Sequence, residues 1–471
     1  MENVKDSQFL NLIEKELITV IKILSSSFDY ISILGSDITG FKYEYSGQSS
    51  SLTESMWADR GFVARIYKFG KVLEYSFNNI QPGDAETVSK KIIQFSENAL
   101  INNFHIYPVP EEEPQSFSHN ENVEIDPSEI DPETVFSELK NIFKETMDSG
   151  KSVFNARVVF EWSKVSKIFL SSKKKLKQNY IWSQSYLIPM VKKDDMVKVI
   201  YAAESGLKGM ELLRDLRNQI KATVKDGESL LNAQSVVPGE YEVICTPDIT
   251  GLIAHEAFGH GVEMDMFVKN RALGKDYIGK QVASPLVNMR DGAIPERHAG
   301  SFHFDDEGTA AGNTLIIENG ILKRGISDLH SAFSQKTKPT GNGRRQSYKN
   351  KTYTRMTNTY FEPGNDNLES MLASVKHGYL LDYTQSGMED PKNWGLQAIA
   401  ILGKEIKNGK FTGKIISPVI MTGYVPDILK NTTMIGDKLE LSGSGYCGKG
   451  WKEFVKVSSG GPYIKTRIRL G

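Results

Sequence analysis

Two histidines and a glutamate stand close together in the stretch LIAHEAFGHGVEMD, residues 252–265. His255 and His260 offer nitrogen ligands of the kind that zinc binds, and Glu256 is a carboxylate suited to accepting a proton. In the familiar helical zinc motif the two histidines are four residues apart and share one helix face. Here they are five residues apart. Either the pattern is a coincidence, or the metal site is built on a different local backbone.

The five-residue spacing restricts that backbone. Each residue of an α-helix turns by about 100°, so side chains five positions apart point about 140° away from each other. A wider turn with i→i+5 hydrogen bonds would return both imidazoles to one face, and such π-bulges tend to occur at functional sites. Alternatively, the helix ends at Gly259, where backbone freedom returns His260 to the metal. The sequence leaves both arrangements open.

A catalytic zinc site usually has three protein ligands and one open position, so two histidines need a partner. The candidates are another histidine, a carboxylate such as Glu263 or Asp265, and a thiolate. Cys447 lies in the glycine-rich stretch GSGYCGKGW, which would let a thiolate approach a metal closely. Cys245 lies in YEVICTPD, a predicted buried strand, where cysteine is more often a small hydrophobic residue. Position alone favours Cys447 only slightly over the carboxylates.

The elements that must position these residues predict an α+β fold. Helix-period and strand-like runs form a helix–β-meander–helix pattern, with helices expected over 7–26 and 84–102, and the pattern recurs after residue 132. We expect a β-rich C-terminal catalytic domain that carries a short helix with the His-Glu-x-x-x-His pattern. The predicted boundaries are an N-terminal α/β subdomain (1–105), an acidic proline-rich linker or loop (106–131), a central α/β subdomain (132–232) and the C-terminal domain (233–471).

Composition narrows the class of protein. The 471 residues include 57 Lys plus Arg and 58 Asp plus Glu, a formal net charge of −1. This balance argues against a nucleic-acid partner. The sequence shows neither a secretory signal nor the run of about 18 apolar residues that a membrane helix needs. Two cysteines are too few for a disulfide framework. We therefore expect a cytoplasmic protein with reduced thiols and no membrane association.

Five motifs carry a resemblance to a known family. HEAFGHGVE, FDDEGTAAGNTLIIENGILK, PTGNGRRQSY, RMTNTYFEPG and SGYCGKG occur in this order and resemble the TldD branch of the TldD/PmbA metallopeptidases, once called modulators of DNA gyrase. The resemblance is strong over about 239–471 and looser over 1–232. One departure is the bulky surroundings of Cys447, where Tyr446 and Trp451 lie nearby in the sequence.

The resemblance implies a ligand set and a cofactor. His255 and His260 would bind Zn²⁺, Cys447 would be the third ligand, and Glu256 would be the catalytic base. The TldE/PmbA branch has lost the metal motif and serves as a partner subunit, whereas this chain retains every ligand. The resemblance therefore implies the active subunit of a homodimer, or of a heterodimer with a TldE/PmbA-like chain.

Donors for the oxyanion of the reaction are a separate question. The candidates, for contact with the substrate or its oxyanion, are Arg344 and Arg345 of GNGRRQSY and Arg355 and Asn358 of RMTN. Each is at least as well explained by surface salt bridges and turn contacts.

Two further groups of polar residues resemble metal ligands less. Asp305, Asp306 and Glu307 of FDDEGT are better explained as residues that organise a turn or pair with arginines. His298 and His303 are also five residues apart, but no glutamate follows the first, and the sequence alone indicates that they are not ligands.

The sequence therefore predicts a zinc-dependent metallopeptidase that hydrolyses small or unfolded polypeptides. The alternative is a non-enzymatic regulatory or scaffold protein with a structural metal. Structural zinc sites normally have four protein ligands, and only three are convincing here, which favours the enzyme. A metal hydrolase that acts on a non-peptide amide also remains open.

Overall fold

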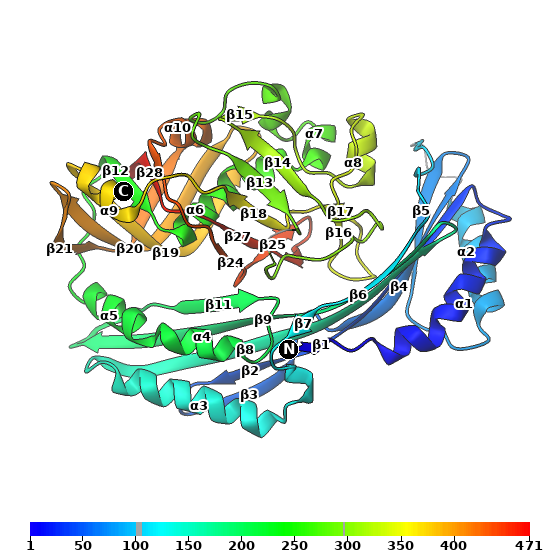
Figure 1. The fold of residues 1–471 in the computed structure, drawn as a ribbon, viewed down its shortest axis with the longest axis horizontal. Helices are drawn as coiled ribbons and strands as arrows, with labels where there is room; N and C mark the ends of the chain where they lie inside the picture. The colour runs from blue at the N-terminus through cyan, green and yellow to red at the C-terminus, as the bar shows by residue number, and fades with distance from the viewer. Residues whose placement is uncertain (100–105, 295–296) are drawn as a thin grey trace.

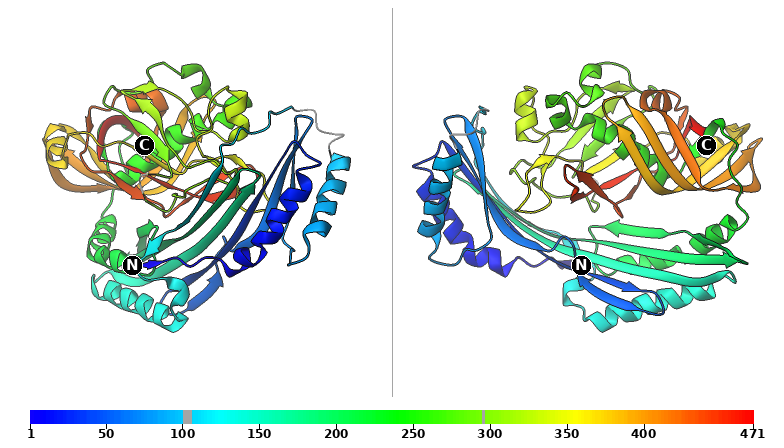
Figure 2. Two further views of the ribbon diagram at one scale, coloured as in Figure 1. Left: turned by 45° about the vertical axis from the view of Figure 1, so that its right-hand side comes forward. Right: turned by 180° about the vertical axis from the view of Figure 1, so that it is seen from behind.

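The computed structural model describes residues 1–99, 106–294 and 297–471 (Figure 1). The chain forms a long curved N-terminal sheet and a β-rich C-terminal part, residues 239–471. Figures 1 and 2 show the C-terminal part lying over one face of this sheet, while helices α1 and α3 lie on the other. The β-rich mixed α/β character predicted from the sequence is confirmed. Within the described residues, no helix has the length and apolar content needed to cross a bilayer.

The N-terminal sheet has nine strands, in the order β10-β9-β8-β2-β4-β5, with β11 and β6 paired to β9 and β3 paired to β2. Strands from both predicted α/β subdomains therefore belong to one sheet, joined where β2 pairs with β8. The strands are β2 (Tyr30–Tyr45), β3 (Ser50–Glu54), β4 (Asp59–Lys68), β5 (Lys71–Phe77), β6 (Gln115–Asn120), β8 (Val153–Ser171), β9 (Lys174–Lys193), β10 (Met196–Val199) and β11 (Ala202–Gly206).

Five helices accompany this sheet: α1 (Gln8–Leu24), α2 (Ala85–Ala99), α3 (Pro132–Asp148), α4 (Leu212–Asn218) and α5 (Ile220–Leu230). Helix α1 buries an apolar stripe that includes Leu10, Ile13 and Leu17, and Ser7 caps its N-terminus. Asp131 caps α3, which begins with a proline. The predicted end of the helix over 84–102, and the predicted boundary at 105, lie outside the described residues.

The segment 106–131 differs from the expected linker or loop. It contains β6, which pairs parallel to β9, and β7 (Asn122–Val123), which pairs with β1 (Glu2–Asn3). A 3-10 turn, η2 (Pro127–Glu129), precedes α3. The sequence QSFSHN of β6 shows no apolar alternation because Phe117 is its single apolar residue. Phe117 packs against Phe304, and main-chain pairing with β9 aligns the rest of this short strand.

The C-terminal part contains a seven-stranded and a six-stranded sheet. Their orders are β12-β19-β20-β22-β28-β23, with β21 paired to β20, and β15-β14-β13-β18-β27-β24. The strands of the first sheet are β12 (Gly239–Cys245), β19 (His377–Asp390), β20 (Gly395–Lys407), β21 (Lys410–Ile416), β22 (Val419–Tyr424), β23 (Met434–Ile435) and β28 (Ile464–Leu470). Those of the second are β13 (Met289–Gly292), β14 (Asn313–Glu318), β15 (Ile321–Leu322), β18 (Asn358–Phe361), β24 (Glu440–Ser442) and β27 (Ser458–Gly461).

A helical segment packs between these two sheets and positions the site. It consists of α6 (Pro247–Leu252), η3 (Ile253–Gly259), η4 (His260–Val262) and α7 (Met264–Val268), and it contacts β18 and β27 on one side and β19 on the other. The other elements are η5 (Leu273–Tyr277), α8 (Leu329–Ser334), α9 (Leu368–Ser374), α10 (Val425–Lys430) and the hairpins β16–β17 (Gly343–Arg344, Tyr353–Thr354) and β25–β26 (Tyr446–Lys449, Glu453–Lys456).

Candidate metal centre

The stretch that contains both histidines adopts the wider of the two backbone arrangements. Residues 253–259 form a π-helical turn, and the N–H of His260 donates to the carbonyl of His255, five residues back. The helical path continues past Gly259 into η4. The two imidazole rings lie 5.1 Å apart between centroids and almost perpendicular, at 84°. Five-residue spacing therefore brings the two rings to one side of the helix.

Small residues allow this helix to lie deep in the core. A Cβ at Gly259 would lie 2.2 Å from the sulfur of Met356, and one at Gly251 would lie 2.8 Å from the main chain of Gly460. Ala254, Ala257 and Phe258 are fully buried around them. The glycines are thus needed for close packing, which fixes the helix and the direction of its histidines.

The structure brings Cys447 of β25 to the two histidines. The ligand atoms of His255, His260 and Cys447 all lie within 4.8 Å of one another. The Cys447 Sγ is 3.5 Å from His260 Nε2. Sulfur and nitrogen at about 2.3 Å and 2.0–2.1 Å from a tetrahedral zinc ion would be about 3.6 Å apart. Among the described residues, the buried Nδ1 of His255 has no hydrogen-bond partner. The three residues therefore fit a zinc ion.

The charge state of Cys447 also suits a metal ligand. Burial raises the pKa of its thiol, but the neighbouring His260 and His255 outweigh burial and hold the pKa well below its usual value. Burial lowers the pKa of His260, but Cys447 and Glu263 outweigh it and raise the pKa well above its usual value. The metal-free site thus favours a thiolate–imidazolium pair, and metal binding would displace the imidazolium proton.

Glu263 holds His260 from the side opposite Cys447. Its carboxylate lies 3.1 Å from His260 Nδ1, whereas Nε2 of the same ring faces the thiolate. Lys449 donates to Glu263 at 2.9 Å and to Asp265 at 2.7 Å. Burial raises the pKa of Glu263, but Lys449 and His260 outweigh it and lower the pKa to about 2. Glu263, an open alternative for the third ligand, therefore lies behind the His260 ring, the position from which outer carboxylates commonly orient metal-binding histidines.

The four candidate oxyanion donors are engaged in other contacts. The buried Arg355 donates to the main-chain carbonyls of Cys447 and, at 3.2 Å, of Glu453, and so fixes the hairpin that carries the thiolate. Arg344 donates to two main-chain carbonyls, Arg345 pairs with Glu74, and the Asn358 amide donates to Gly292 and Ser301. Contact of these four side chains with a substrate stays a prediction.

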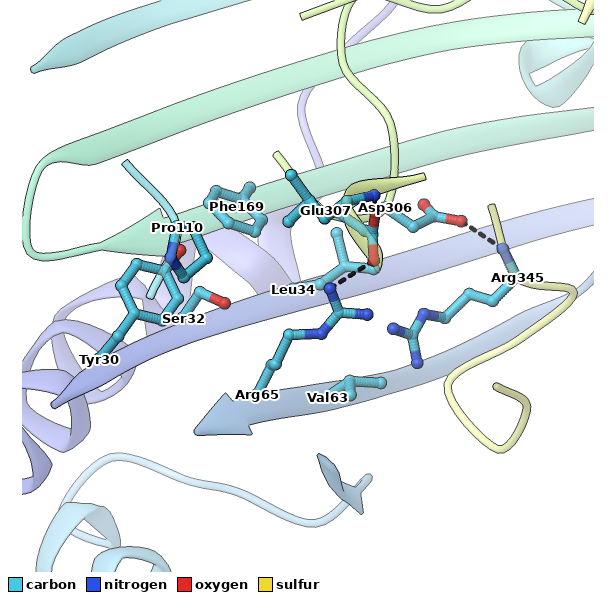
Figure 3. Close-up of a pocket in the computed structure, with 11 residues that line it drawn as sticks. Tyr30, Ser32, Leu34, Val63, Arg65, Pro110, Phe169, Asp306, Glu307 and Arg345 are labelled. Atoms are coloured by element: carbon cyan, nitrogen blue, oxygen red, sulfur yellow. Dashed lines mark hydrogen bonds and ion pairs between the residues drawn. The ribbon is translucent and has the colours of Figure 1, made fainter. Parts of the chain in front are cut away.

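The acidic triplet of FDDEGT organises a turn and pairs with basic residues, as the sequence predicts. Figure 3 shows two of its members, Asp306 beside Arg345 and Glu307 beside Arg65. Asp305 accepts main-chain N–H bonds from Glu307 and Thr309, each at 2.9 Å. Asp306 pairs with Lys167 of β8, and Glu307 pairs with Arg65 of β4. The triplet thus joins the C-terminal part to the N-terminal sheet.

The N-terminal sheet also supports the loop that leads to Cys447. Tyr186 of β9 donates to the Ser444 carbonyl, and Ser205 of β11 accepts from the Gly443 N–H at 2.7 Å. Lys456, on the strand paired with β25, donates to Gln184 of β9 at 2.5 Å. These side chains belong to ordinary strands far away in the sequence, and no motif indicates their contribution.

Glu256 lies beside strand β19. A Cβ at Gly387 of that strand would lie 2.8 Å from the Glu256 Cγ. Two residues further on, both carboxylate oxygens of Glu389 are buried, without a hydrogen-bond partner among the described residues. Burial raises the pKa of Glu389 well above its usual value, so this carboxyl group favours the protonated state. Sequence reasoning missed Glu389, which belongs to no recognisable motif.

Comparisons with known proteins indicate a metallopeptidase family. Residues 238–467 match the family described as PmbA/TldA metallopeptidase C-terminal domain. A metalloprotease of Methanocaldococcus jannaschii is 34% identical over 268 residues, which cover 56% of this chain and 58% of that protein. A zinc metalloprotease TldD homolog of Saccharolobus solfataricus is 34% identical over 235 residues, which cover 50% and 52%. The chain thus spans a little over half the length of these curated relatives.

Two crystal structures share the fold. TldE from Thermococcus kodakarensis has a TM-score of 0.80 at 18% identity and covers 97% of this chain and 100% of its own. A Thermotoga maritima protein, described as a modulator of a DNA gyrase, has a TM-score of 0.80 at 15% identity and covers 98% and 100%. At these identities the likeness concerns the fold alone. The sequence matches lead to one conclusion: residues 238–467 form a C-terminal domain of the TldD/PmbA family of metallopeptidases.

Proposed function

We propose that this protein is a zinc-dependent metallopeptidase of the TldD branch that hydrolyses peptide bonds of small or unfolded polypeptides. One observation carries the proposal: the ligand atoms of His255, His260 and Cys447 lie within 4.8 Å of one another. Glu256 stands next to the first of them on the same turn. The names of the relatives, which include a zinc metalloprotease, support the same reading.

The residues of the chain divide the work as follows. Zinc, when bound, would supply a Lewis acid and lower the pKa of a coordinated water from about 15.7 to about 7. The Glu256 carboxylate would accept the proton of the attacking water and deliver it to the leaving amine. Glu263 and Lys449 would keep His260 in its liganding orientation, and Arg355 would keep Cys447 in place.

The partner and the location are proposals as well. We infer a homodimer or a heterodimer with a TldE/PmbA-like subunit, and the fold shared with TldE supports a partnership between related chains. A cytoplasmic location agrees with the two free, buried cysteines.

Metal analysis combined with digestion of a peptide library tests the function. The purified chain should contain zinc and cleave peptides, and chelation should stop the cleavage. A Glu256→Gln protein should bind as much zinc as the wild type and cleave almost nothing. A chain that binds zinc but cleaves no peptide, with or without a TldE-like partner, would instead support the scaffold alternative with a structural metal.

A further inference from the structure

A second histidine–carboxylate cluster lies between the N-terminal sheet and the C-terminal part. His119 belongs to β6, Glu121 follows that strand, and His303 comes from a loop of the C-terminal part, 182 residues after Glu121. The ligand atoms of the three residues lie within 4.8 Å of one another. The sequence alone indicates that His303 is no ligand, because no glutamate follows His298. The residues that join His303 in the structure are far away in the chain.

The distances within this cluster match a tetrahedral site. Nε2 of His119 and Nε2 of His303 each lie 3.3 Å from Oε1 of Glu121. Two ligands at about 2.0–2.1 Å from a tetrahedral zinc ion are about 3.3 to 3.4 Å apart. Among the described residues, the buried Nε2 of His119 makes no hydrogen bond, although it lies beside the carboxylate. A metal ion at the centre of the cluster would bond to this nitrogen.

The two imidazole rings would have to separate slightly around an ion. Their centroids are 3.8 Å apart and their planes are tilted by 40°, whereas the rings at the first site are 5.1 Å apart. The side chains of His119 and His303 are 41% and 26% exposed, so a movement of about 1 Å meets little packing resistance.

Arg297 is the group that opposes a cation here. Its guanidinium pairs with Oε2 of Glu121, the oxygen that does not face the histidines. The Arg297 side chain is 57% exposed and can turn into solvent. Glu121 itself is buried, so its charge needs compensation by arginine, by a metal or by both.

We propose that His119, Glu121 and His303 form a second binding site for a divalent transition-metal ion such as Zn²⁺, with water as the fourth ligand. The ion ties the segment that contains β6 to the loop around His303, and so joins the N-terminal sheet to the C-terminal part. Two histidines and one carboxylate are a common ligand set for zinc. The site shares no residue with the cluster of His255, His260 and Cys447.

Cobalt titration of the full-length chain tests this site separately from the first. Co²⁺ bound to Cys447 gives a thiolate-to-cobalt charge-transfer band, which a site made only of nitrogen and oxygen ligands lacks. A Cys447→Ser protein should lose this band and still bind one equivalent of Co²⁺. His119→Gln and His303→Gln, each in that background, should weaken the remaining binding by more than the roughly 10- to 100-fold typical of an outer-shell change.

Two further variants serve as controls. His377 pairs with Glu405 at 3.4 Å, but among the described residues it belongs to no cluster of three metal ligands. His377→Gln should therefore leave Co²⁺ binding unchanged. Arg297→Ala removes the competing cation and should tighten binding, a sign opposite to that of His303→Gln. Circular dichroism and the metal-free Tm show whether each variant is folded.

Three outcomes would overturn the second site: a folded Cys447→Ser protein that binds no Co²⁺, equal binding after His303→Gln, or equal loss after His377→Gln. Absence of the charge-transfer band in the wild type would instead count against the first site. In that case the second site, with its nitrogen and oxygen ligands, would still bind one equivalent of Co²⁺.

Discussion

The two histidine clusters differ in how far the fold prepares them for a metal. In the first, a π-helical turn in the core contains His255 and is followed directly by His260, and the rings are 5.1 Å apart at 84°. In the second, His119 and Glu121 of one segment meet His303 of another at the boundary between the two parts, with rings 3.8 Å apart at 40°. The first has a thiolate and a buried carboxylate behind one ring, whereas the second has an exposed arginine that competes for its carboxylate.

Buried groups that hold the ligands in place reduce the conformational freedom lost when the ion binds. A site whose ligands are already placed loses little freedom when the ion binds, so its affinity is high. A site assembled from partly exposed side chains must order them first, and its affinity is lower. We expect zinc to fill the first cluster before the second.

The largest effect is expected at Glu256. Glu256→Gln should lower kcat for peptide cleavage by about 10²- to 10⁴-fold, because the proton acceptor is lost while the ligands remain. Zinc content should stay at the wild-type level.

His260→Ala should instead lose zinc from the first cluster, since two remaining ligands bind weakly. A fully zinc-loaded first cluster in His260→Ala would mean that the five-residue spacing has no role in metal binding.

The two cysteines should differ in how strongly chelation of the metal increases their alkylation. Cys447→Ser should lower zinc affinity and nearly abolish cleavage, because a neutral hydroxyl is a poor substitute for a thiolate. Alkylation of Cys447 at pH 7 should rise sharply after chelation. Cys245 provides the matched control, since burial raises the pKa of its thiol to about 12. Mass mapping of the modified cysteines checks this, and equal labelling of Cys447 with and without chelator would contradict it.

The support behind His260 should have a smaller effect. Lys449→Met removes the cation that holds Glu263 and Asp265 and should weaken zinc binding at the first cluster by about 10- to 100-fold. Lys269→Met is the control, because Lys269 also pairs with Asp265, but at 3.4 Å and with a half-exposed side chain. Competition with a chromogenic chelator measures both affinities. Equal zinc affinities for the two variants would show that the support from Lys449 does not strengthen zinc binding. The absence of such a support from the second cluster would then not explain a lower affinity there.

The contact between the N-terminal sheet and the C-terminal part should also lose stability in acid, because Glu74 of β5 pairs there with Arg345. Burial raises the pKa of Glu74, but Arg345 and Arg65 outweigh it and lower the pKa from 4.5 to about 2. A lowered folded-state pKa gives stability that is present above about pH 4.5 and is lost as the pH falls towards 2. Glu74→Gln should therefore lower the free energy of unfolding by a few kcal/mol at pH 7 and by less at pH 3.

Urea denaturation at the two pH values measures this difference. The exposed Glu86, which lies 3.9 Å from Lys90, is the control, and Glu86→Gln should change little at either pH. A Glu74→Gln effect that is the same at both pH values would contradict the assignment.

Local patterns predicted much of the first cluster and none of the second. His255, Glu256 and His260 are contiguous, so their spacing and the need for a third ligand could be read directly, and the family resemblance named Cys447. The positioning role of Arg355 could not be read, because its bond to the Cys447 carbonyl joins residues 92 positions apart. His119 and His303 meet only because β6 pairs with β9 beneath the C-terminal part. The sequence also could not predict that both N-terminal subdomains share one sheet, because the pairing of β2 with β8 joins two distant stretches of the chain.

The loop before Cys447 has a consequence for dissecting this protein. A fragment that begins at residue 238 keeps His255, Glu256, His260 and Cys447 in one polypeptide. It loses Tyr186 and Ser205, on which residues 443 and 444 rest. Such a fragment would contain the reactive residues but lack the contacts that hold the loop before Cys447. The hairpin that carries the thiolate could then move away from the two imidazoles. We therefore expect metal binding and cleavage to require a longer chain than the one that contains the four reactive residues.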